Sequence, residues 1–412
     1  MPEVACSGPA PPTTPGRDTC GLFNVAAWIP WRLDAAASMK VLMVSNSDWG
    51  MYKSNLHLAA ELLAQGIEVV LLCPEGPYSA RMREAGHRVL DWHLRRRSLA
   101  PITEARALLH LIRHYRKERP DAVHHFTIKP NLYGTIAAHV ARVPHVLNTW
   151  TGLGYVFSDA LQAKVLRLFL LPLMRLLRRS ARVWTIFEIE HDRQALLHLG
   201  VVEHERTTVI GSSVDSSRFA PHKGRADGPP VVLMAARLLH TKGVVELVAA
   251  AELLRESGIR VRTVIAGVPD PGNPGSFTDR EIAHMRRGGC AEFLGHVEDM
   301  PGLLRRANLA VLPTYYNEGV PLFLLEAAAS GLPLIGTDIG GCQVIVRPGV
   351  NGLIVPARDP KALAEAIATL VSNPALRAQM GAASREIAIR EFDQSQVIEQ
   401  YWDVYRAVGV LT

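Results

Sequence analysis

Short apolar runs alternate with longer stretches of helical periodicity along the chain from residue 39 onward. Nearly uninterrupted apolar runs indicate strands buried on both faces, as in a parallel sheet. In the first half these runs are Val41–Ser45, Glu68–Leu72, Ala122–His125, His145–Asn148, Val183–Phe187 and Thr207–Ile210. The helices predicted between them are Asn55–Gln65, Thr103–Glu118, Leu132–Arg142, Ala160–Arg179 and Glu190–Leu199. The alternation predicts a doubly wound α/β domain over residues 39–215.

The pattern stops in a polar, loop-like stretch at residues 211–230 and then starts again. The second set of predicted strands is Val231–Ala235, Val261–Ala266, Glu292–Leu294, Leu309–Leu312, Pro333–Gly336 and Gly352–Val355. The helices predicted with them are Gly243–Glu256, Thr278–Arg287, Leu322–Ser330 and Pro360–Ser372. A second α/β domain is therefore expected over residues 216–390, with a last helix, Gln396–Ala407, in residues 391–412. Ligands bind beyond the carboxyl ends of parallel strands, so loops that follow strands, facing a cleft between the domains, should hold the chemistry.

Residues 1–38 have a different character. They are rich in Pro, Gly, Thr and Ala, and no basic stretch followed by an apolar one marks a signal peptide. We interpret them as a disordered leader or a misassigned start before Met39. The five cysteines are scattered without a CxxC pair, which is not typical of a disulfide framework or a zinc site and fits a reducing cytosol.

The formal charge of +6 gains meaning from where the basic residues lie. Several recur at helical spacing over residues 160–182, on one narrow face: Lys164, Arg167, Arg175, Arg178 and Arg182. Apolar residues fill much of the rest of this helix, which Pro172 is expected to kink or interrupt. Such a helix is typical of attachment to an anionic membrane surface, and it is too charged to span a bilayer. A packed helix with a solvated basic face is the alternative.

The strongest chemical pattern follows the strand Leu309–Leu312. Glu318 is placed in the loop and Glu326 about one turn inside the next helix. The backbone at the start of that helix is expected to face a phosphate or an anionic sugar group, through Gly319, Val320, Pro321 and Leu322. Two carboxylates beside such a site can accept sugar or ribose hydroxyls. The alternative is that both are ordinary solvated residues, but an unpaired carboxylate among the apolar neighbours of Glu326 would be costly.

Further loops of the second domain follow strands in the same way. Arg237 and Lys242 come after Val231–Ala235, and a guanidinium and an ammonium group suit a diphosphate. Gly340 and Gly341 follow the strand Pro333–Gly336 and permit a ligand to approach the backbone closely. Val297 follows the strand Glu292–Leu294, where its backbone would lie along the edge of a nucleobase. For each loop a simple surface turn is the alternative.

The first domain offers candidate residues for contact with an acceptor substrate. Thr151 and Gly152 lie in a glycine-punctuated loop after a strand, and His125 and Lys129 end another. Arg96 sits in a run of three arginines and is a candidate for an acceptor phosphate. For the histidine, packing or capping is the alternative. No cluster with metal-ligand spacing and no Asp-x-Asp pair is present, so no metal or other cofactor is expected.

Taken in order, these elements resemble glycosyltransferase family 4. The resemblance rests on Glu318 and Glu326 with seven residues between them, Arg237 with Lys242-Gly243, and the paired glycines after Asp338, and it runs from about Met39 to the C-terminus. The stretches His124–Gly134 and Asn148–Phe157 resemble the bacterial capsule, O-antigen and exopolysaccharide branch.

The resemblance implies the GT-B fold and retaining transfer of a sugar from a nucleotide donor, usually UDP-linked. Arg237 and Lys242 would hold the diphosphate and stabilise the leaving group, Glu326 would bind the ribose and Glu318 the donor sugar. It also implies a last helix that crosses back to the first domain. The expected acceptor is a polyprenyl-diphosphate-linked glycan at the inner face of the cytoplasmic membrane. The chain departs from the family pattern in two places: it has no His in the first-domain loop around Thr151, and Gln343-Val344 stand where an acidic residue is usual.

Three other functions compete with this one. A nucleotide-sugar epimerase of the same architecture would need neither a glycan acceptor nor a membrane. A non-catalytic membrane-associated protein would not need all four donor-site residues. Nucleic-acid binding is least favoured, because aromatic side chains do not interleave with the basic ones.

Overall fold

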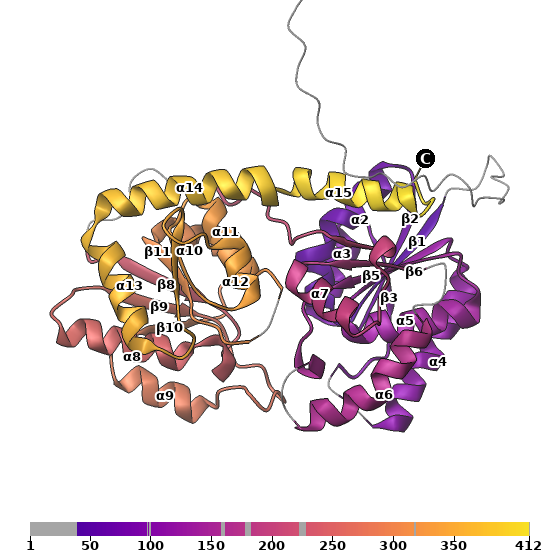
Figure 1. Ribbon diagram of the computed structural model, residues 1–412, viewed down its shortest axis with the longest axis horizontal. Helices are drawn as coiled ribbons and strands as arrows, with labels where there is room; N and C mark the ends of the chain where they lie inside the picture. Colours follow the sequence, from indigo (N-terminus) through magenta and orange to yellow (C-terminus); the bar gives the residue numbers. More distant parts are fainter. Residues whose placement is uncertain are drawn as a thin grey trace, which may run out of the picture. The chain divides into compact units, whose positions relative to one another are not determined.

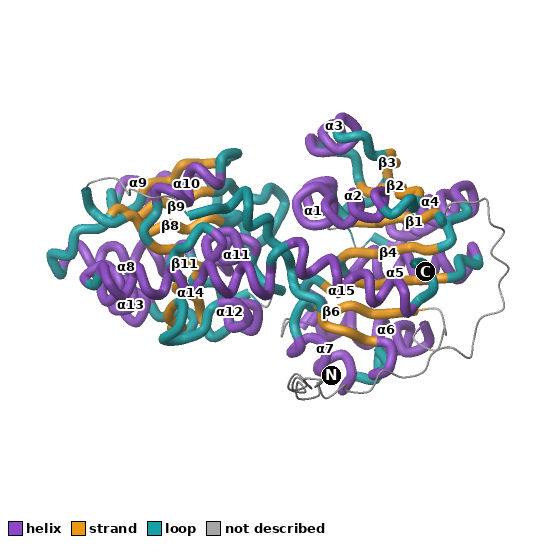
Figure 2. Tube along the Cα trace, turned by 90° about the horizontal axis from the view of Figure 1, so that it is seen from above, coloured by secondary structure: helices purple, strands orange, loops and turns teal. Residues whose placement is uncertain are grey.

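The computed structural model describes residues 39–96, 98, 100–157, 161–177, 183–221, 228–316 and 319–411, so the leader interpretation of residues 1–38 lies outside the described residues. Two sheets of parallel strands, each flanked by helices, make up the described chain (Figure 1). Seen from above, the strands of each sheet lie side by side (Figure 2). This is the expected α/β architecture.

The first sheet has the strand order β3-β2-β1-β4-β5-β6-β7. Its strands are β1 (Lys40–Ser45), β2 (Glu68–Cys73), β3 (Arg88–Asp91), β4 (Ala122–Phe126), β5 (His145–Trp150), β6 (Val183–Phe187) and β7 (Thr207–Val209). The accompanying helices are α1 (Asp48–Gly50), η1 (Met51–Asn55), α2 (Leu56–Ala64), α3 (Pro77–Glu84), α4 (Pro101–Glu118), α5 (Ile128–Ala141), η2 (Tyr155–Phe157), α6 (Leu161–Leu177), α7 (Glu190–His198) and η3 (His204–Arg206).

The second sheet has the order β10-β9-β8-β11-β12-β13. Its strands are β8 (Val231–Ala235), β9 (Arg262–Ala266), β10 (Glu292–Gly295), β11 (Leu309–Leu312), β12 (Leu334–Thr337) and β13 (Gly352–Val355). Its helices are η4 (His240–Lys242), α8 (Val244–Glu256), α9 (Asp279–Arg287), α10 (Met300–Arg306), α11 (Leu322–Ala329), α12 (Gly340–Ile345) and α13 (Pro360–Ser372), followed by α14 (Pro374–Phe392) and α15 (Gln394–Ala407).

Side-chain alternation along the strands builds a core on each face of the first sheet. Val41 and Met43 of β1 pack in one cluster, whereas Leu42 and Val44 pack in the other, against α4 and α5. Trp402 of α15 belongs to the first of these clusters, although α14, which precedes α15, packs against α11 of the second sheet. The expected crossing of the C-terminal helix to the first domain is thereby confirmed (Figure 1).

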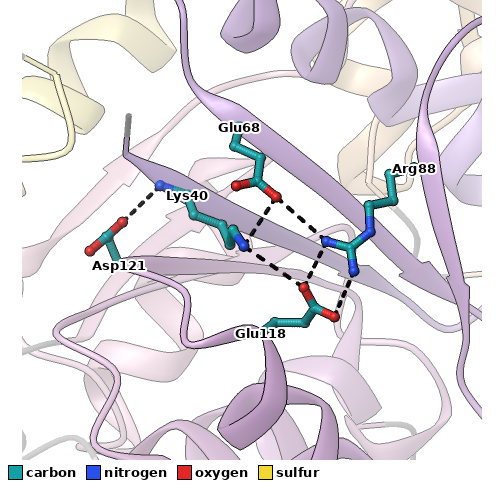
Figure 3. A network of polar contacts seen from close by, with 5 residues as sticks. All are labelled: Lys40, Glu68, Arg88, Glu118 and Asp121. Carbon is teal, nitrogen blue, oxygen red and sulfur yellow. Dashed lines mark hydrogen bonds and ion pairs between the residues drawn. The ribbon is translucent and has the colours of Figure 1, made fainter. Parts of the chain in front are cut away.

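An ion-pair network ties the amino ends of β1, β2 and β3 to the end of α4 (Figure 3). The buried Glu118 carboxylate accepts two hydrogen bonds from the Arg88 guanidinium, at 2.7 and 2.8 Å. Lys40 Nζ lies 3.1 Å from Glu68 and 3.9 Å from Glu118, and its backbone N–H donates to Asp121 at 2.8 Å. The paired hydrogen bonds from Arg88 to Glu118 hold α4 against the sheet.

One structural expectation is wrong in part. Helix α6 continues through Pro172 without interruption. A proline inside a helix removes one backbone hydrogen bond and crowds the preceding turn, and neighbouring packing, here of Leu171 and Met174 in an apolar cluster, can offset that cost. No disulfide joins the described cysteines, which are Cys73, Cys290 and Cys342.

Candidate functional site

Polar loops meet where the strand order of the second sheet reverses. Strand β8 pairs with β9 on one side and with β11 on the other, so connections leave β8 and β11 in opposite directions. In open parallel sheets this switch point leaves room for a ligand beyond the carboxyl ends of the strands. The loop that carries Lys242 begins there at the end of β8, and the segment before α11 begins there at the end of β11.

Hydrogen bonds join three of these loops. The Thr241 carbonyl, after β8, accepts from the Tyr315 N–H at 2.9 Å and from the Thr314 hydroxyl at 3.1 Å, both after β11. The Thr314 carbonyl in turn accepts from the buried Thr337 hydroxyl at the end of β12. The loops are therefore held in a fixed relation before any ligand binds.

Gly243 shows how closely the loops approach one another. Its φ of +80° is in the left-handed region, and a Cβ there would lie 2.1 Å from the Pro313 carbonyl oxygen. The Lys-Gly pair is thus explained by backbone contact with the loop after β11, because no larger residue fits.

The two predicted phosphate ligands occupy this region. Lys242 is buried at the end of η4, while Arg237 is about half exposed after β8. Arg237 pairs with Asp270 at 2.6 Å, a carboxylate from the loop after β9. Asp270 thus orients the guanidinium, and a diphosphate that bound Arg237 would share it with this carboxylate.

Glu326 lies on α11 and is partly buried. Burial raises the pKa of its carboxyl to about 7, although the positive charges of Lys53 and Arg218 act in the opposite direction. Burial, with Arg218 next, lowers the pKa of Lys53. In its ionised form this carboxyl can accept hydrogen bonds from ligand hydroxyls, and a pKa so far above the ordinary value is typical of functional sites.

Gly319 lies at the segment before α11, buried against the first domain. A Cβ at this position would lie 1.8 Å from the Glu188 carboxylate and 3.2 Å from the Thr151 carbonyl oxygen. The structure thus brings together Gly319 and Thr151, which were predicted for opposite sides of the site. Val320 and Pro321 are buried, and Leu322 begins α11. Glu318 lies outside the described residues.

The remaining donor-side candidates also lie beyond strand ends. Gly340 begins α12, where a Cβ would approach Ile189 at 3.5 Å, and Gly341 is buried beside it. Val297 is partly buried two residues after β10. The neighbouring Glu298 pairs with Arg81 of α3 at 3.0 Å.

The acceptor-side candidates in the first domain have different surroundings. His125 is completely buried, and its ring nitrogens contact Asn148 at 2.7 Å and Tyr115 at 2.8 Å. Burial lowers the pKa of His125 to about 4, so it is a neutral core residue. This corresponds to the packing alternative and argues against direct contact with an acceptor.

Lys129 is engaged in an internal contact as well. Its ammonium group pairs with Glu104 at 2.7 Å and donates to the carbonyls of Ser98 and Arg95 at 2.6 and 3.3 Å. Lys129 therefore fixes the loop after β3 rather than facing solvent. Arg96 of that loop is exposed, and Gly152 is buried after β5 with a φ of +114°.

Several residues at the site carry no sequence motif. Lys53, Arg218, Asp270 and Glu188 join it only through the fold. Lys53 lies in η1, a stretch of π-helix, and such stretches are frequent at functional sites. Among the described residues no group of three His, Cys, Asp or Glu side chains is arranged to hold a metal ion.

Models of two known protein families match the chain. The model described as "Glycosyl transferase 4-like domain" matches residues 50–212, and the model described as "Glycosyl transferases group 1" matches residues 215–387. The chain belongs to glycosyltransferase family 4. It is a glycosyltransferase, and the epimerase alternative gains no support from these matches.

Curated relatives of this family 4 enzyme are transferases of bacterial glycans. The N,N'-diacetylbacillosaminyl-diphospho-undecaprenol alpha-1,3-N-acetylgalactosaminyltransferase of Campylobacter jejuni is 25% identical over 90% of this chain and 99% of its own length. The UDP-Gal:alpha-D-GlcNAc-diphosphoundecaprenol alpha-1,3-galactosyltransferase of Escherichia coli is 24% identical over 75% of this chain and 81% of its own.

A solved structure supports the fold. HepE of Anabaena, in complex with UDP, superposes with a TM-score of 0.71 over 90% of this chain and 100% of that chain, at 19% identity. Together with the two parallel sheets, this likeness confirms the expected GT-B fold.

Proposed function

We propose that this enzyme transfers a sugar from a UDP-linked donor to a glycan carried on polyprenyl diphosphate, with retention of the anomeric configuration. The names of the Campylobacter and Escherichia relatives, both of which specify a diphospho-undecaprenol acceptor, support the acceptor class. The Anabaena structure of the same fold holds UDP. Bacterial surface polysaccharide synthesis is the setting that these acceptors suggest.

The observation that carries the proposal is the set of loops joined at the switch point of the second sheet. There Arg237 and Lys242 offer two cations to a diphosphate and would stabilise the charge that develops as the nucleotide leaves. Glu326 would accept hydrogen bonds from the ribose hydroxyls. Glu318, on the adjoining segment, would contact the donor sugar. Because these cations can take the place of a divalent ion, we propose a reaction without a metal cofactor.

Backbone groups would complete donor binding. The segment Gly319–Leu322 and the start of α12 at Gly340 and Gly341 would bind the phosphates and sugar, since N–H groups at helix starts attract anions. The backbone at Val297 would lie along the edge of the nucleobase.

The decisive experiment is sugar transfer from UDP-sugars by Glu326→Ala and Lys242→Ala, with Glu252→Ala on the exposed face of α8 as the control. Each site variant should lose roughly a hundredfold or more in rate, and the control should keep wild-type activity. Wild-type rates in both site variants would refute the donor site. The product's anomeric configuration, read by NMR, tests retention, and activity that is lost with a chelator would refute metal independence.

We also propose that the enzyme attaches peripherally to the inner face of the cytoplasmic membrane through α6. Lys164 and Arg175 are exposed on this helix, and so are Val165, Leu168 and Leu176, of which Leu168 is 71% exposed. Cations beside exposed apolar side chains suit an anionic lipid surface. Arg178 and Arg182 lie outside the described residues. No helix in the described part of the chain is long and apolar enough to cross a membrane.

A further inference from the structure

A polar pocket lies in the first domain, beside the edge strand β3 and its neighbour β2. It has a volume of about 850 Å³, is open to solvent, and is lined by the loops after β2 and β3 and by one face of α4. Pockets of several hundred Å³ are large enough for small ligands. Because the pocket lies at the carboxyl ends of these strands, it is on the side of the sheet where α/β domains bind ligands.

Three arginines of this pocket have no carboxylate partner within the described part of the chain. Arg95, Arg106 and Arg113 line it, and none of them forms an ion pair with a carboxylate among the residues that the structure describes. The two lining carboxylates have other partners: Glu75 accepts two hydrogen bonds from Arg83 at 2.8 and 2.7 Å, and Asp91 contacts His93 Nε2 at 2.8 Å.

Hydrogen bonds hold the pocket wall in place. The Trp92 indole N–H donates to the Ala107 carbonyl at 3.0 Å, and the His93 backbone N–H donates to His110 Nδ1 at 3.2 Å. Since Nδ1 of His110 accepts, a neutral ring carries its proton on Nε2 and offers one more donor. Lys129 holds the Arg95 carbonyl.

The outer face of α4 adds an apolar component. Ile102, Arg106, Leu109 and Arg113 follow one another at helical spacing on one face. Ile102 is 69% and Leu109 51% exposed, so apolar and cationic side chains alternate along this face. A ligand that is complementary to it combines phosphate groups with a hydrocarbon chain.

We propose that this pocket, with the outer face of α4, binds the diphosphate of the lipid-linked acceptor and the first part of its polyprenyl chain. The proposal rests on the proposed function and adds the place where the acceptor is held. Arg106, Arg113 and Arg95 would contact the phosphates, while Leu109 and Ile102 would contact the chain. Charge-assisted bonds from arginine forks to phosphate favour this ligand over a neutral glycan.

The test is binding of farnesyl diphosphate to the full-length protein by calorimetry, with inorganic pyrophosphate and farnesol as partial ligands. The double variant Arg106→Gln/Arg113→Gln should bind farnesyl diphosphate at least roughly tenfold more weakly. Arg116→Gln, which removes an exposed charge from the same helix outside the pocket, should bind it like wild type. UDP affinity should be unchanged in all variants, which separates this site from the donor site.

Other results would overturn the inference. Unchanged farnesyl diphosphate binding in the double variant refutes the site even if the enzyme transfers sugar normally. Pyrophosphate binding as tightly as farnesyl diphosphate refutes the polyprenyl contact. If the double variant loses binding to phosphatidylglycerol vesicles but keeps farnesyl diphosphate, membrane headgroups are the phosphate source. Failure of wild type to transfer sugar, with the pocket intact, refutes the proposed function instead.

Discussion

At the scale of single residues, we predict that Glu326 makes nucleotide binding depend on pH. Its pKa of about 7 in the free protein means that the carboxyl is largely protonated at pH 6. Ribose hydroxyls need the ionised form as an acceptor, so binding should release a proton. We expect UDP affinity, measured by calorimetry, to be roughly tenfold weaker at pH 6 than at pH 8.

The matched variant is Glu326→Gln, which should bind UDP weakly with little dependence on pH between 6 and 8. The stability of the free protein should follow the opposite trend with pH. A carboxyl whose pKa is raised on folding stabilises most below its unfolded value, and this contribution is lost as pH rises through about 7. An equal pH slope of UDP affinity in both proteins would contradict the assignment of Glu326.

Gly243 allows a prediction about backbone approach. In Gly243→Ala the new Cβ meets the Pro313 carbonyl, so the loops after β8 and β11 must separate and move Lys242. UDP affinity should fall at least roughly tenfold, with a thermal destabilisation of several degrees. Gly258→Ala is the control, since its φ of +73° carries a similar strain but nothing lies within 4 Å. Equal behaviour of the two variants would mean that the contact is unimportant.

Residue identity alone does not reliably separate residues of the binding site from residues of the core. Arg237, Lys242 and Glu326 were predicted as site residues because each lies in the loop after a strand or in the helix that follows it. His125 and Lys129 follow a strand too, yet one hydrogen-bonds inside the core and the other holds a loop. The sequence cannot distinguish these cases, because the partners Asn148 and Glu104 come from elements distant in the chain.

At the scale of elements, the network in Figure 3 predicts which carboxylate stabilises α4. Glu118 is buried and receives both Arg88 hydrogen bonds, whereas Glu68 is about 40% exposed. Glu118→Gln removes the buried charge and one of the two acceptor oxygens that Glu118 offers Arg88, and should cost about 2 kcal/mol in the free energy of unfolding, measured with urea. Glu68→Gln should cost well under 1 kcal/mol. The reverse order would show that Arg88 depends on Glu68.

Helix α6 carries the prediction for membrane attachment. The double variant Leu168→Glu/Leu176→Glu should reduce flotation with anionic liposomes severalfold, because both exposed leucines become charged. Charge reversal at Lys164 and Arg175 should act similarly, more strongly at low salt. The control is Leu253→Glu, at a partly exposed position on α8. Flotation unchanged by both α6 variants would return this helix to the solvated alternative.

Element prediction succeeded where the local sequence signals were strong. The strand Val183–Phe187 and the helix Pro360–Ser372 have the predicted bounds, since a buried apolar run and an Asp359 N-cap mark them. The edge strand β3 was missed because only four residues form it and Arg88 and Asp91 flank its apolar pair. Helix α14 was missed because its buried residues are spread around the helix without a single apolar face.

At the scale of the whole molecule, the last helix, α15, packs into the core of the first sheet. Tyr405 of α15 donates to or accepts from His124 of β4 at 2.8 Å, and Trp402 packs beside it. Within the described chain, α14 and α15 therefore link the second sheet to the first. The sequence predicted the last helix, but its packing partners came from the resemblance, because no local pattern specifies a contact 281 residues away.

This link predicts cooperative unfolding. In wild type, UDP binding to the second domain should raise the temperature of one shared calorimetric transition, since a ligand stabilises every part that unfolds with its site. Trp402→Ala should cost the first domain about 3 kcal/mol and separate a low-temperature transition that UDP no longer shifts. Ile389→Ala, at an exposed position on α14, should keep the single transition. Two transitions in the wild type, only one of them responding to UDP, would show that α15 does not couple the domains.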